Sequence, residues 1–535
     1  EHRGVAMSTK AVSRSAGKLD HAVHSIHEGM SIMKAVICFL TVATAVPLAA
    51  QSSVDTAGTG ALIDQALNRS EVMQNLRHLS DVIGPRLSGS PAMRRANEWT
   101  AERFKTYGLT TRLEPYTFGV TWERGPASLR LTAPFSRAIE AYSWAWTEGT
   151  GGKTVAGPVV LADLTTPESL AVYREKVKGA WVLPRAPYPV WNPDGPEMTA
   201  EDSTRLKEQF RLRSLPTADT STAAVAARRQ FTVDLPYILK AAGALGSLVD
   251  GAKEHGLMTM SGSPTRVAPL PNLVISNEDY ALLARMIAAG TTPRLEGRVD
   301  NRLGKTPVQQ WNTVAEIRGS ERPGQVVILG AHLDSWDLGT GTTDNGTGSM
   351  VVLEAARAIA HCRLKPKRTI RFILFSGEEQ GLLGSRAYAE AHAATADSIQ
   401  VVLVLDNGTG AVTGQALQGR TDLEGIWKEL LAPVARLDAD SVRDASKMGT
   451  DHLSFLPYGV PGFNFDQLRR GYNHTHHSQS DTYDKAVAGD LKQAAAVMAA
   501  TAYELANLPE LLRRGPRSPV VPVPTRPSPG LVAGR

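Results

Sequence analysis

Cysteine is almost absent from this chain. Only two cysteines, Cys38 and Cys362, occur among its 535 residues. This scarcity excludes a framework of disulfide bonds and a metal site built from several thiolates. The fold must therefore rest on its hydrophobic core, and a hydrophobic content of 42% is ordinary for globular proteins. A chain of this length can form two or three domains.

The sequence also lacks an excess of one charge outside its two ends. The overall pI is 9.1, with 58 Lys and Arg against 53 Asp and Glu. Residues 1–50 hold five basic and three acidic residues, and residues 513–535 hold five Arg and no acid. The remaining part, residues 51–512, has 48 basic and 50 acidic residues. We therefore expect no extended basic surface and no nucleic-acid partner.

Long hydrophobic runs are missing as well. The apolar stretch Ala35–Val46 is too short to cross a membrane with ease. It follows Met33-Lys34 and precedes Pro47-Leu48-Ala49-Ala50, which is typical of a secretory signal peptide, and an N-terminal anchor is the alternative. We expect Met33 to be the true start, residues 1–32 to be upstream translation, and the mature chain to begin near residue 51. The protein would then be secreted or periplasmic, with no stable membrane anchor after cleavage of the signal.

Strands and helices alternate in two parts of the chain. In residues 51–120 and 301–512, apolar runs of strand length alternate with segments of helical periodicity. This alternation predicts an α/β domain whose mostly parallel central sheet is covered by helices on both faces. Residues 121–300 between them contain short strands and many Gly and Pro, which indicates an inserted, β-rich domain. Residues 513–535 are rich in Pro and are expected to be a disordered tail.

The segment Gly330–Gly348, GAHLDSWDLGTGTTDNGTG, is the first candidate site. It follows the apolar run Val326–Leu329, a predicted buried strand, and leads into a helical segment. His332 and Asp334 would lie at the carboxyl end of this strand, and Asp344 in the loop before the helix. Open α/β sheets have their sites at that edge, and His with carboxylates suits a divalent ion such as zinc. On its own, the His-x-Asp pattern fits a structural pair equally well.

Two further strand ends and one late loop carry the same kinds of side chains. Glu378-Glu379 follows the apolar strand Arg368–Phe375, and Asp406 follows Val401–Leu405. The loop Tyr472–Thr482 contributes three histidines. These imidazoles and carboxylates fit two metal ions that share one bridging carboxylate, an arrangement suited to hydrolysis.

The adjacent glutamates are expected to have different tasks. Neighbouring residues of an extended segment point in opposite directions. One of Glu378 and Glu379 can therefore bind a metal, while the other acts as general base and passes a proton from water to a leaving amine. Asp334 lies on the same side of its strand as His332 and can hold the second nitrogen of that imidazole.

Taken in order, the motifs GAHLDSW, TTDNGTG, FSGEEQGLLGS, VLDNGTG and HHSQSDT resemble those of the co-catalytic zinc aminopeptidase family. The resemblance extends over most of the mature chain, including VIGPRLSGS near its start, and is strongest to a branch of carboxypeptidases and dipeptidases. It implies a zinc exopeptidase fold of the phosphorylase/hydrolase-like type and two Zn²⁺ per chain. It also implies that residues 121–300 are a protease-associated domain and that the protein can form a homodimer.

The resemblance implies a role for each candidate residue. Asp344 would bridge the two ions, with His332 and Asp406 completing one site, Glu379 and His477 completing the other, and Glu378 acting as general base. His477 is preferred to His474 and His476 because the pair Asp481-Thr482 follows it at the spacing of the family. A cis peptide bond is implied at Asp344–Asn345, where this chain has Asn345 in place of an Asp that is frequent in the family.

Several activities are compatible with this pattern. The first is an exported enzyme that acts on dipeptides or short peptides with free termini, and the second is an aminopeptidase that removes N-terminal residues. A third is a relative that has lost its metals and serves as a binding protein, although every expected ligand and the base are present. A single-zinc cyclase that forms pyroglutamate ends is disfavoured by the presence of Asp406.

Overall fold

The structure, a computed structural model, describes residues 56–190 and 222–518. The predicted signal peptide at residues 33–50, the upstream residues 1–32 and the end of the predicted tail, from residue 519, lie outside the described residues. Within the described part of the chain, no helix combines the length and the apolar character needed to cross a membrane.

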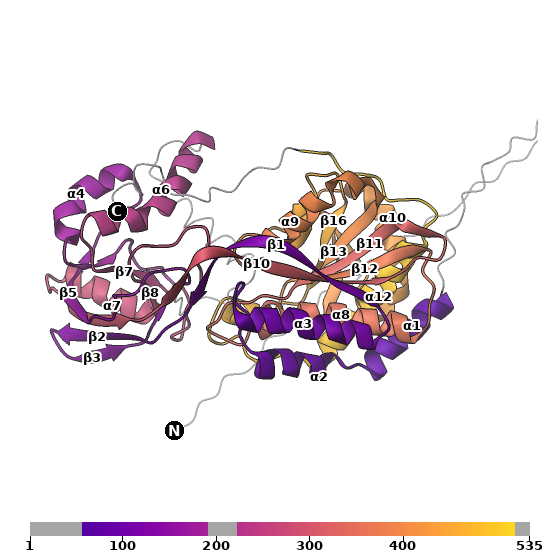
Figure 1. The fold of residues 1–535 in the computed structure, drawn as a ribbon, viewed down its shortest axis with the longest axis horizontal. Coiled ribbons are helices and arrows are strands. Elements are labelled where there is room, and N and C mark those ends of the chain that lie inside the picture. The colour runs from indigo at the N-terminus through magenta and orange to yellow at the C-terminus, as the bar shows by residue number, and fades with distance from the viewer. Residues whose placement is uncertain (1–55, 191–221, 519–535) are drawn as a thin grey trace, which may run out of the picture. The chain divides into compact units, whose positions relative to one another are not determined.

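Two eight-stranded sheets form the framework of the described fold (Figure 1). The first contains, in spatial order, β1 (Thr110–Glu123), β10 (Arg302–Ile317), β12 (Arg368–Phe375), β11 (Arg322–His332), β13 (Ile399–Val404), β16 (Gly462–Gln467), β14 (Val412–Ala416) and β15 (Ser441–Arg443). Its centre is parallel, because β11 pairs in parallel with β12 and β13, and β13 with β16. Antiparallel pairs add β10 and β1 on one side and β14 on the other. The sheet is therefore mixed, and the predicted mostly parallel arrangement holds for its centre.

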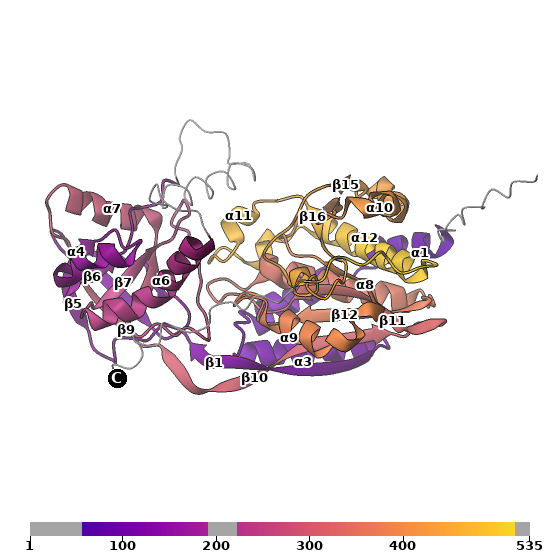
Figure 2. The same cartoon turned by 90° about the horizontal axis from the view of Figure 1, so that it is seen from above.

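Helices cover both faces of the first sheet. They are α1 (Thr56–Asn68), α2 (Val72–Arg77), α3 (Pro91–Thr106), α8 (Thr347–His361), α9 (Leu383–Ala391), α10 (Glu424–Leu431), α11 (Tyr472–Thr475) and α12 (Ala488–Asn507). Figure 2 shows α8 and α12 side by side against the sheet. In β11, Val327 and Leu329 pack in the core that contains α8 and α12, whereas Val326 and Ile328 pack in another core with Tyr388 of α9. Successive residues of this strand are thus buried against opposite layers, which explains its uninterrupted apolar run.

The second sheet lies between residues 127 and 299, within the segment predicted to be an insert. Its strands, in spatial order, are β3 (Arg137–Ile139), β2 (Ala127–Ala133), β9 (Arg294–Val299), β5 (Val155–Leu161), β6 (Trp181–Leu183), β7 (Gly246–Asp250), β8 (Asn272–Ile275) and β4 (Ala141–Ser143). Among the described residues of this segment, the helices α4 (Pro167–Val177), α6 (Thr222–Ala241) and α7 (Asn277–Ala288) accompany them. Leu283 of α7 packs in one core with Trp181, and Leu239 of α6 packs in another with Val182. This sheet is therefore covered by helices as well.

Helical periodicity predicts helices over residues 61–83 and 421–437, and Thr450-Asp451 is a possible cap of a third helix, but all three differ in the structure. The helix expected over residues 61–83 is divided into α1, α2 and a π-helical turn at His78–Ile83. The helix expected over residues 421–437 keeps only α10 as α-helix, followed by a tighter 3₁₀ turn that contains Pro433, which has no N–H to donate. The helix expected after Thr450 is a short 3₁₀ turn at Asp451–Ser454, and the Thr450 side chain does not cap it.

The predicted disorder of the tail is wrong for residues 513–518. The guanidinium of Arg514 donates to the carbonyl oxygens of Ile399 (2.5 Å) and Ala396 (2.8 Å). Arg517 forms an ion pair with Asp397 at 2.5 Å. Backbone carbonyls at and before the start of β13 need hydrogen-bond donors, and Arg514 provides them. These contacts order the first residues of the tail despite its Pro-rich composition.

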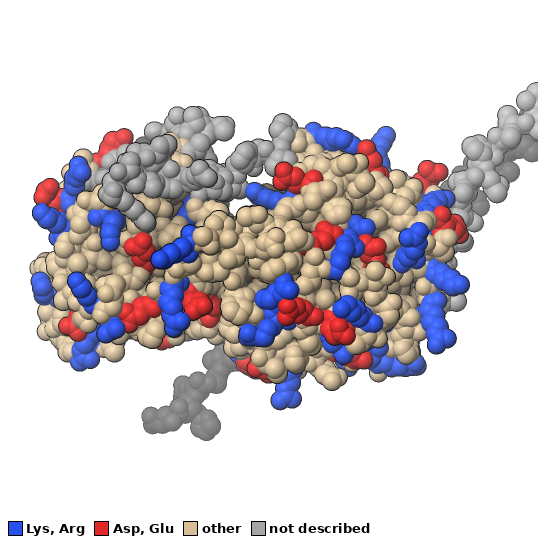
Figure 3. All heavy atoms as spheres, viewed as in Figure 1, with Lys and Arg blue, Asp and Glu red and all other residues tan. Residues whose placement is uncertain are grey.

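The surface carries charges of both signs. On the face seen in Figure 3, Lys and Arg are interspersed with Asp and Glu, and neither sign gathers into a continuous patch. This agrees with the even balance of charge between residues 51 and 512.

Candidate metal centre

Three candidate segments meet at the carboxyl edge of the parallel centre of the first sheet. His332 is the last residue of β11, Glu378 and Glu379 follow β12, and Asp406 follows β13. Parallel strands end at the same edge, so these segments are brought together although they are far apart in the sequence.

His332, Asp344 and Asp406 form a first group. Nε2 of His332 lies 3.3 Å from Oδ1 of Asp344 and 3.4 Å from Oδ1 of Asp406. Asp344 belongs to the turn Thr342–Gly346, which connects β11 to α8. One ligand atom from each of the three residues lies within 4.8 Å of the others. A single divalent ion can fill such a space.

A second group lies at the other oxygen of Asp344. Nε2 of His477, in the loop after α11, is 3.4 Å from Oδ2 of Asp344 and 2.9 Å from Oε2 of Glu379. The two oxygens of one carboxylate thus face two different imidazoles, as a bridging ligand requires. Oδ2 of Asp344 and Oε1 of Glu379 are buried and make no hydrogen bond to the described residues. Buried polar atoms need partners, and this set of nitrogen and oxygen donors fits zinc.

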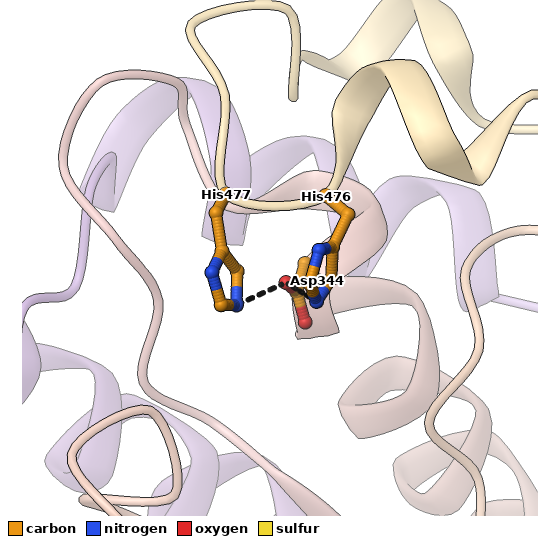
Figure 4. A group of neighbouring side chains, drawn as sticks. All are labelled: Asp344, His476 and His477. Carbon is orange, nitrogen blue, oxygen red and sulfur yellow. Dashed lines mark ion pairs between the residues drawn. The ribbon is translucent and has the colours of Figure 1, made fainter. Parts of the chain in front are cut away.

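His476 lies beside His477 and also approaches Asp344 (Figure 4). Its Nε2 is 3.8 Å from Oδ2 of Asp344, against 3.4 Å for His477, and the two imidazoles stack with centres 3.8 Å apart. His477 is also the less exposed of the two, at 23% against 42%, and it contacts Glu379. The geometry therefore favours His477 as a ligand, with His476 nearer the solvent and His474 exposed.

The protein groups alone make this region strongly negative. Burial by itself would lower the pKa of His332, yet the carboxylates of Asp406 and Asp334 help to raise it well above its ordinary value. Burial, reinforced by the charge of Asp344, raises the pKa of Glu379. A raised pKa means that the site favours uptake of a proton, and thus of positive charge. Divalent ions bound there would supply such charge.

Glu378 and Glu379 lie in a turn and not in the extended segment expected from the sequence. Gly377 has a φ of +71°, and a Cβ on it would lie 2.6 Å from the hydroxyl oxygen of Tyr116, so glycine is required there. The turn still separates the two carboxylates, because Glu379 reaches the second group while Oε2 of Glu378 lies 3.9 Å from Nε2 of His332. Burial raises the pKa of Glu378 well above its ordinary value, and divalent cations bound nearby would shift that pKa in the opposite direction.

Asp334 supports the site in a different way from the one predicted. Nδ1 of His332 lies 3.0 Å from the backbone oxygen of Asp334 and 3.6 Å from its carboxylate. The carbonyl oxygen is therefore the acceptor that orients the imidazole. The carboxylate instead accepts hydrogen bonds from the N–H of Glu378 (3.3 Å) and the hydroxyl of Ser88 (3.1 Å). Asp334 thereby links the end of β11 to the turn after β12.

The turn that contains Asp344 has the cis peptide bond that the resemblance implied. The peptide bond Asp344–Asn345 is cis, which confirms the prediction. Asp481 holds this turn, since its carboxylate accepts from the N–H groups of Thr343 (2.6 Å) and Asp344 (3.2 Å) and from the Thr343 hydroxyl (2.8 Å). Asp481 is four residues after His477, so the late loop and the bridging carboxylate are tied together.

Two residues of the site were not found from the sequence. Asp451 is fully buried, and burial, reinforced by the charge of Asp406, raises its pKa to about 7. The ring of Tyr472 packs against Gly408, since a Cβ on that glycine would lie 2.8 Å from a ring carbon. Burial, reinforced by the charge of Asp344, raises the pKa of the Tyr472 phenol. No local pattern indicates either residue, because Thr-Asp is also the pattern of a helix cap and a single tyrosine is not distinctive.

The loop that carries His477 is held from the second sheet's domain. The N–H of Met260 donates to the carbonyl oxygen of His477 at 2.8 Å. The amide of Gln479 accepts from the N–H of Met258 (3.0 Å) and donates to the carbonyl oxygen of Gly256 (3.0 Å). The segment between β7 and β8 therefore supports one of the two metal-binding groups.

Known proteins share this sequence pattern and this fold. Residues 312–502 match the model of Peptidase family M28. The chain is 29% identical over 456 residues to carboxypeptidase Q of Bos taurus, across 84% of this chain and 88% of that protein. The solved structure of a peptidase M28 precursor from Shewanella amazonensis SB2B matches with a TM-score of 0.71 at 23% identity, across 88% of this chain and 100% of that one. A zinc aminopeptidase from Bacillus subtilis matches with a TM-score of 0.57 at 19% identity, across 81% and 94%.

Proposed function

We propose that this chain, whose residues 312–502 belong to peptidase family M28, is an exported di-zinc exopeptidase that hydrolyses dipeptides or short peptides with free termini. It is a zinc-dependent metallopeptidase, and its similarity to carboxypeptidase Q over most of its length supports the finer assignment. The observation that carries the proposal is the position of Asp344, whose two oxygens face His332 and His477 separately.

The protein ligands divide into two sets around this carboxylate. In the proposal, His332 and Asp406 would hold one zinc ion, Glu379 and His477 would hold the other, and Asp344 would contribute to both sites. When bound, zinc supplies Lewis acidity and makes water more acidic in the site.

Glu378 is the proposed general base. It accepts the proton of the attacking water and returns it to the leaving amine. Its carboxylate lies beside His332 but is not needed in either ligand set. Asp334 is a positioning residue in this scheme, because it orients His332 through its carbonyl and holds the backbone N–H of Glu378 through its carboxylate.

Export and the nature of the insert are further parts of the proposal. Residues 33–50 have the pattern of a secretory signal, which supports a secreted or periplasmic location. We assign residues 121–300 to a domain of the protease-associated type. Because this domain contacts the loop of His476 and His477, it is suited to shape the entrance of the substrate pocket.

An aminopeptidase is the alternative function. The ligand set is equally suitable for it, and the fold is shared with the zinc aminopeptidase of Bacillus subtilis. The metal ligands therefore do not distinguish an aminopeptidase from an enzyme that acts on dipeptides. The shape and charge of the substrate pocket determine which of the two activities the protein has.

The first test combines metal content with a small panel of substrates. We expect two zinc ions per chain, cleavage of a free dipeptide, and no cleavage of the same dipeptide with a blocked N-terminus or of an aminoacyl anilide. Cleavage of the anilide would instead assign the chain to the aminopeptidases. Purified protein that binds no zinc and cleaves nothing would reject the enzyme and favour a binding protein.

A second prediction concerns Gln479, which joins the His477 loop to the second sheet's domain. Gln479→Ala removes both amide hydrogen bonds and is expected to weaken zinc binding at one of the two sites by about tenfold, as losses of supporting groups do. Titration with a competing chelator measures this affinity. Gln309→Ala is the matched control, because Gln309 is exposed on β10. Equal affinities in Gln479→Ala and the control would show that the two hydrogen bonds of Gln479 do not support His477.

A further inference from the structure

The segment Gly84–Ser90 is buried at its centre, although the proposed mechanism uses none of its residues. It connects the π-helical turn ending at Ile83 to α3, and Arg86, Leu87 and Ser88 within it are buried. Burial of an arginine is costly unless its charge and its donors are matched. The partners of Arg86 therefore indicate what this residue does.

Arg86 uses its guanidinium to bind backbone carbonyls. Nε donates to the oxygen of Leu333 (2.7 Å), Nη1 to that of Thr340 (2.9 Å) and Nη2 to that of Gly341 (2.6 Å). Nη1 also donates to the oxygen of Gly84 within its own segment, at 3.0 Å. The other three carbonyls belong to the loop that joins the end of β11 to the turn with the bridging carboxylate. One planar group therefore fixes this loop at both of its ends.

The same segment reaches the turn of the general base. The N–H of Arg86 donates to Oγ of Ser335 (3.0 Å), and the N–H of Ser335 donates back to the carbonyl oxygen of Arg86 (3.2 Å). The hydroxyl of Ser88 donates to Oδ2 of Asp334 (3.1 Å) and accepts from the N–H of Gly377 (2.9 Å). The segment thus connects the loop after β11 with the turn after β12.

Arg86 also brings positive charge to a region rich in carboxylates. Burial lowers its pKa to about 10, and the charges of Asp481, Asp334, Asp344 and Glu379 act in the opposite direction. Its guanidinium therefore stays protonated at neutral pH. A permanent cation reduces the repulsion among these carboxylates before any metal ion binds.

We propose that Arg86 is a positioning residue of the zinc centre, holding the loop between His332 and Asp344 in place and offsetting the repulsion of the carboxylates around it. This inference rests on the proposed function, because it concerns the same two ions. Lysine would keep the charge of Arg86 without its planar set of donors, whereas methionine would keep neither.

The test compares Arg86→Lys, Arg86→Met and Ser88→Ala with Arg95→Met, a control at an exposed position of α3. Zinc affinity is titrated without substrate against a competing chelator, kcat and KM are measured separately, and circular dichroism reports folding. We expect Arg86→Met to lose about 10- to 100-fold in zinc affinity. Arg86→Lys should regain most of that affinity because the charge is kept, yet its kcat should fall by about tenfold with little change in KM, because the loop is no longer fixed. Ser88→Ala should lower kcat several-fold, and the control should match the wild type.

Wild-type zinc affinity in folded Arg86→Met, or a wild-type kcat in Arg86→Lys, would overturn the inference. If Arg86→Met does not fold, the other two variants decide, and unchanged kcat in both of them counts against a positioning role. Wild-type protein that binds no zinc would instead reject the proposed function. The two failures are therefore distinguishable.

Discussion

Replacement of Glu378 by glutamine is expected to lower kcat by about 10²- to 10⁴-fold while both zinc ions stay bound. The amide has the shape of the carboxylate but cannot accept a proton from water. Glu378 lies beside His332 without belonging to either proposed ligand set, so the loss should fall on turnover and not on metal binding. Steady-state kinetics on the substrate found for the wild type, together with the metal content of the same sample, measure both effects.

The matched control for this change is Glu390→Gln. Glu390 is exposed in α9, a short distance along the chain from the turn of Glu378. The control should keep wild-type kcat and zinc content. Wild-type turnover in Glu378→Gln would remove Glu378 as the base, and loss of zinc would place it among the ligands.

Replacement of Asp344 by alanine is expected to remove both zinc ions and all measurable turnover. Its two oxygens face different imidazoles, so one substitution would take a ligand from each proposed ion and remove the anion between them. Close unscreened cations repel strongly. Metal analysis after equilibration with a weak chelator measures the loss. Removal of a group that only supports a ligand costs about 10- to 100-fold in metal affinity, and we expect removal of the shared ligand to cost more.

Asp440→Ala serves as the control for the same chemical change, because Asp440 is exposed. It should retain two zinc ions and full activity. If Asp344→Ala keeps one ion tightly, Asp344 belongs to a single site. If it keeps both, the carboxylate does not bridge.

Much of the candidate site could be predicted because its residues follow apolar strands. Val326–Leu329 and Phe372–Phe375 are continuous apolar runs, which indicates strands buried on both faces, and parallel strands of this kind end at one edge. The positions of His332, Glu378 and Asp406 follow from that rule. The late loop has no such strand before it, so His477 was selected by resemblance, and its distance to Asp344 came only from the structure.

Other parts of the site depend on contacts that no local pattern reveals. The carbonyl oxygen of Asp334, and not its carboxylate, orients His332, since β11 ends at His332 and Asp334 lies beyond the regular strand. Arg86 binds carbonyl oxygens, which every residue carries, so its partners cannot be identified from side-chain types. Asp451 follows a threonine in a pattern that also describes a helix cap, and only the packed fold buries it beside the other carboxylates.

The sequence separation of these partners has a consequence for how the protein is made. Arg86 belongs to the first part of the fold, whereas His477 arrives after β16, shortly before the last helix. Contacts between such distant segments form late in folding, since long loops must close before they are stabilised. During synthesis, the proposed ligand His477 is therefore added only when the chain is nearly complete. If the protein is exported before it folds, the proposed pair of ions would be acquired after translocation, from the zinc supply of the compartment that receives it.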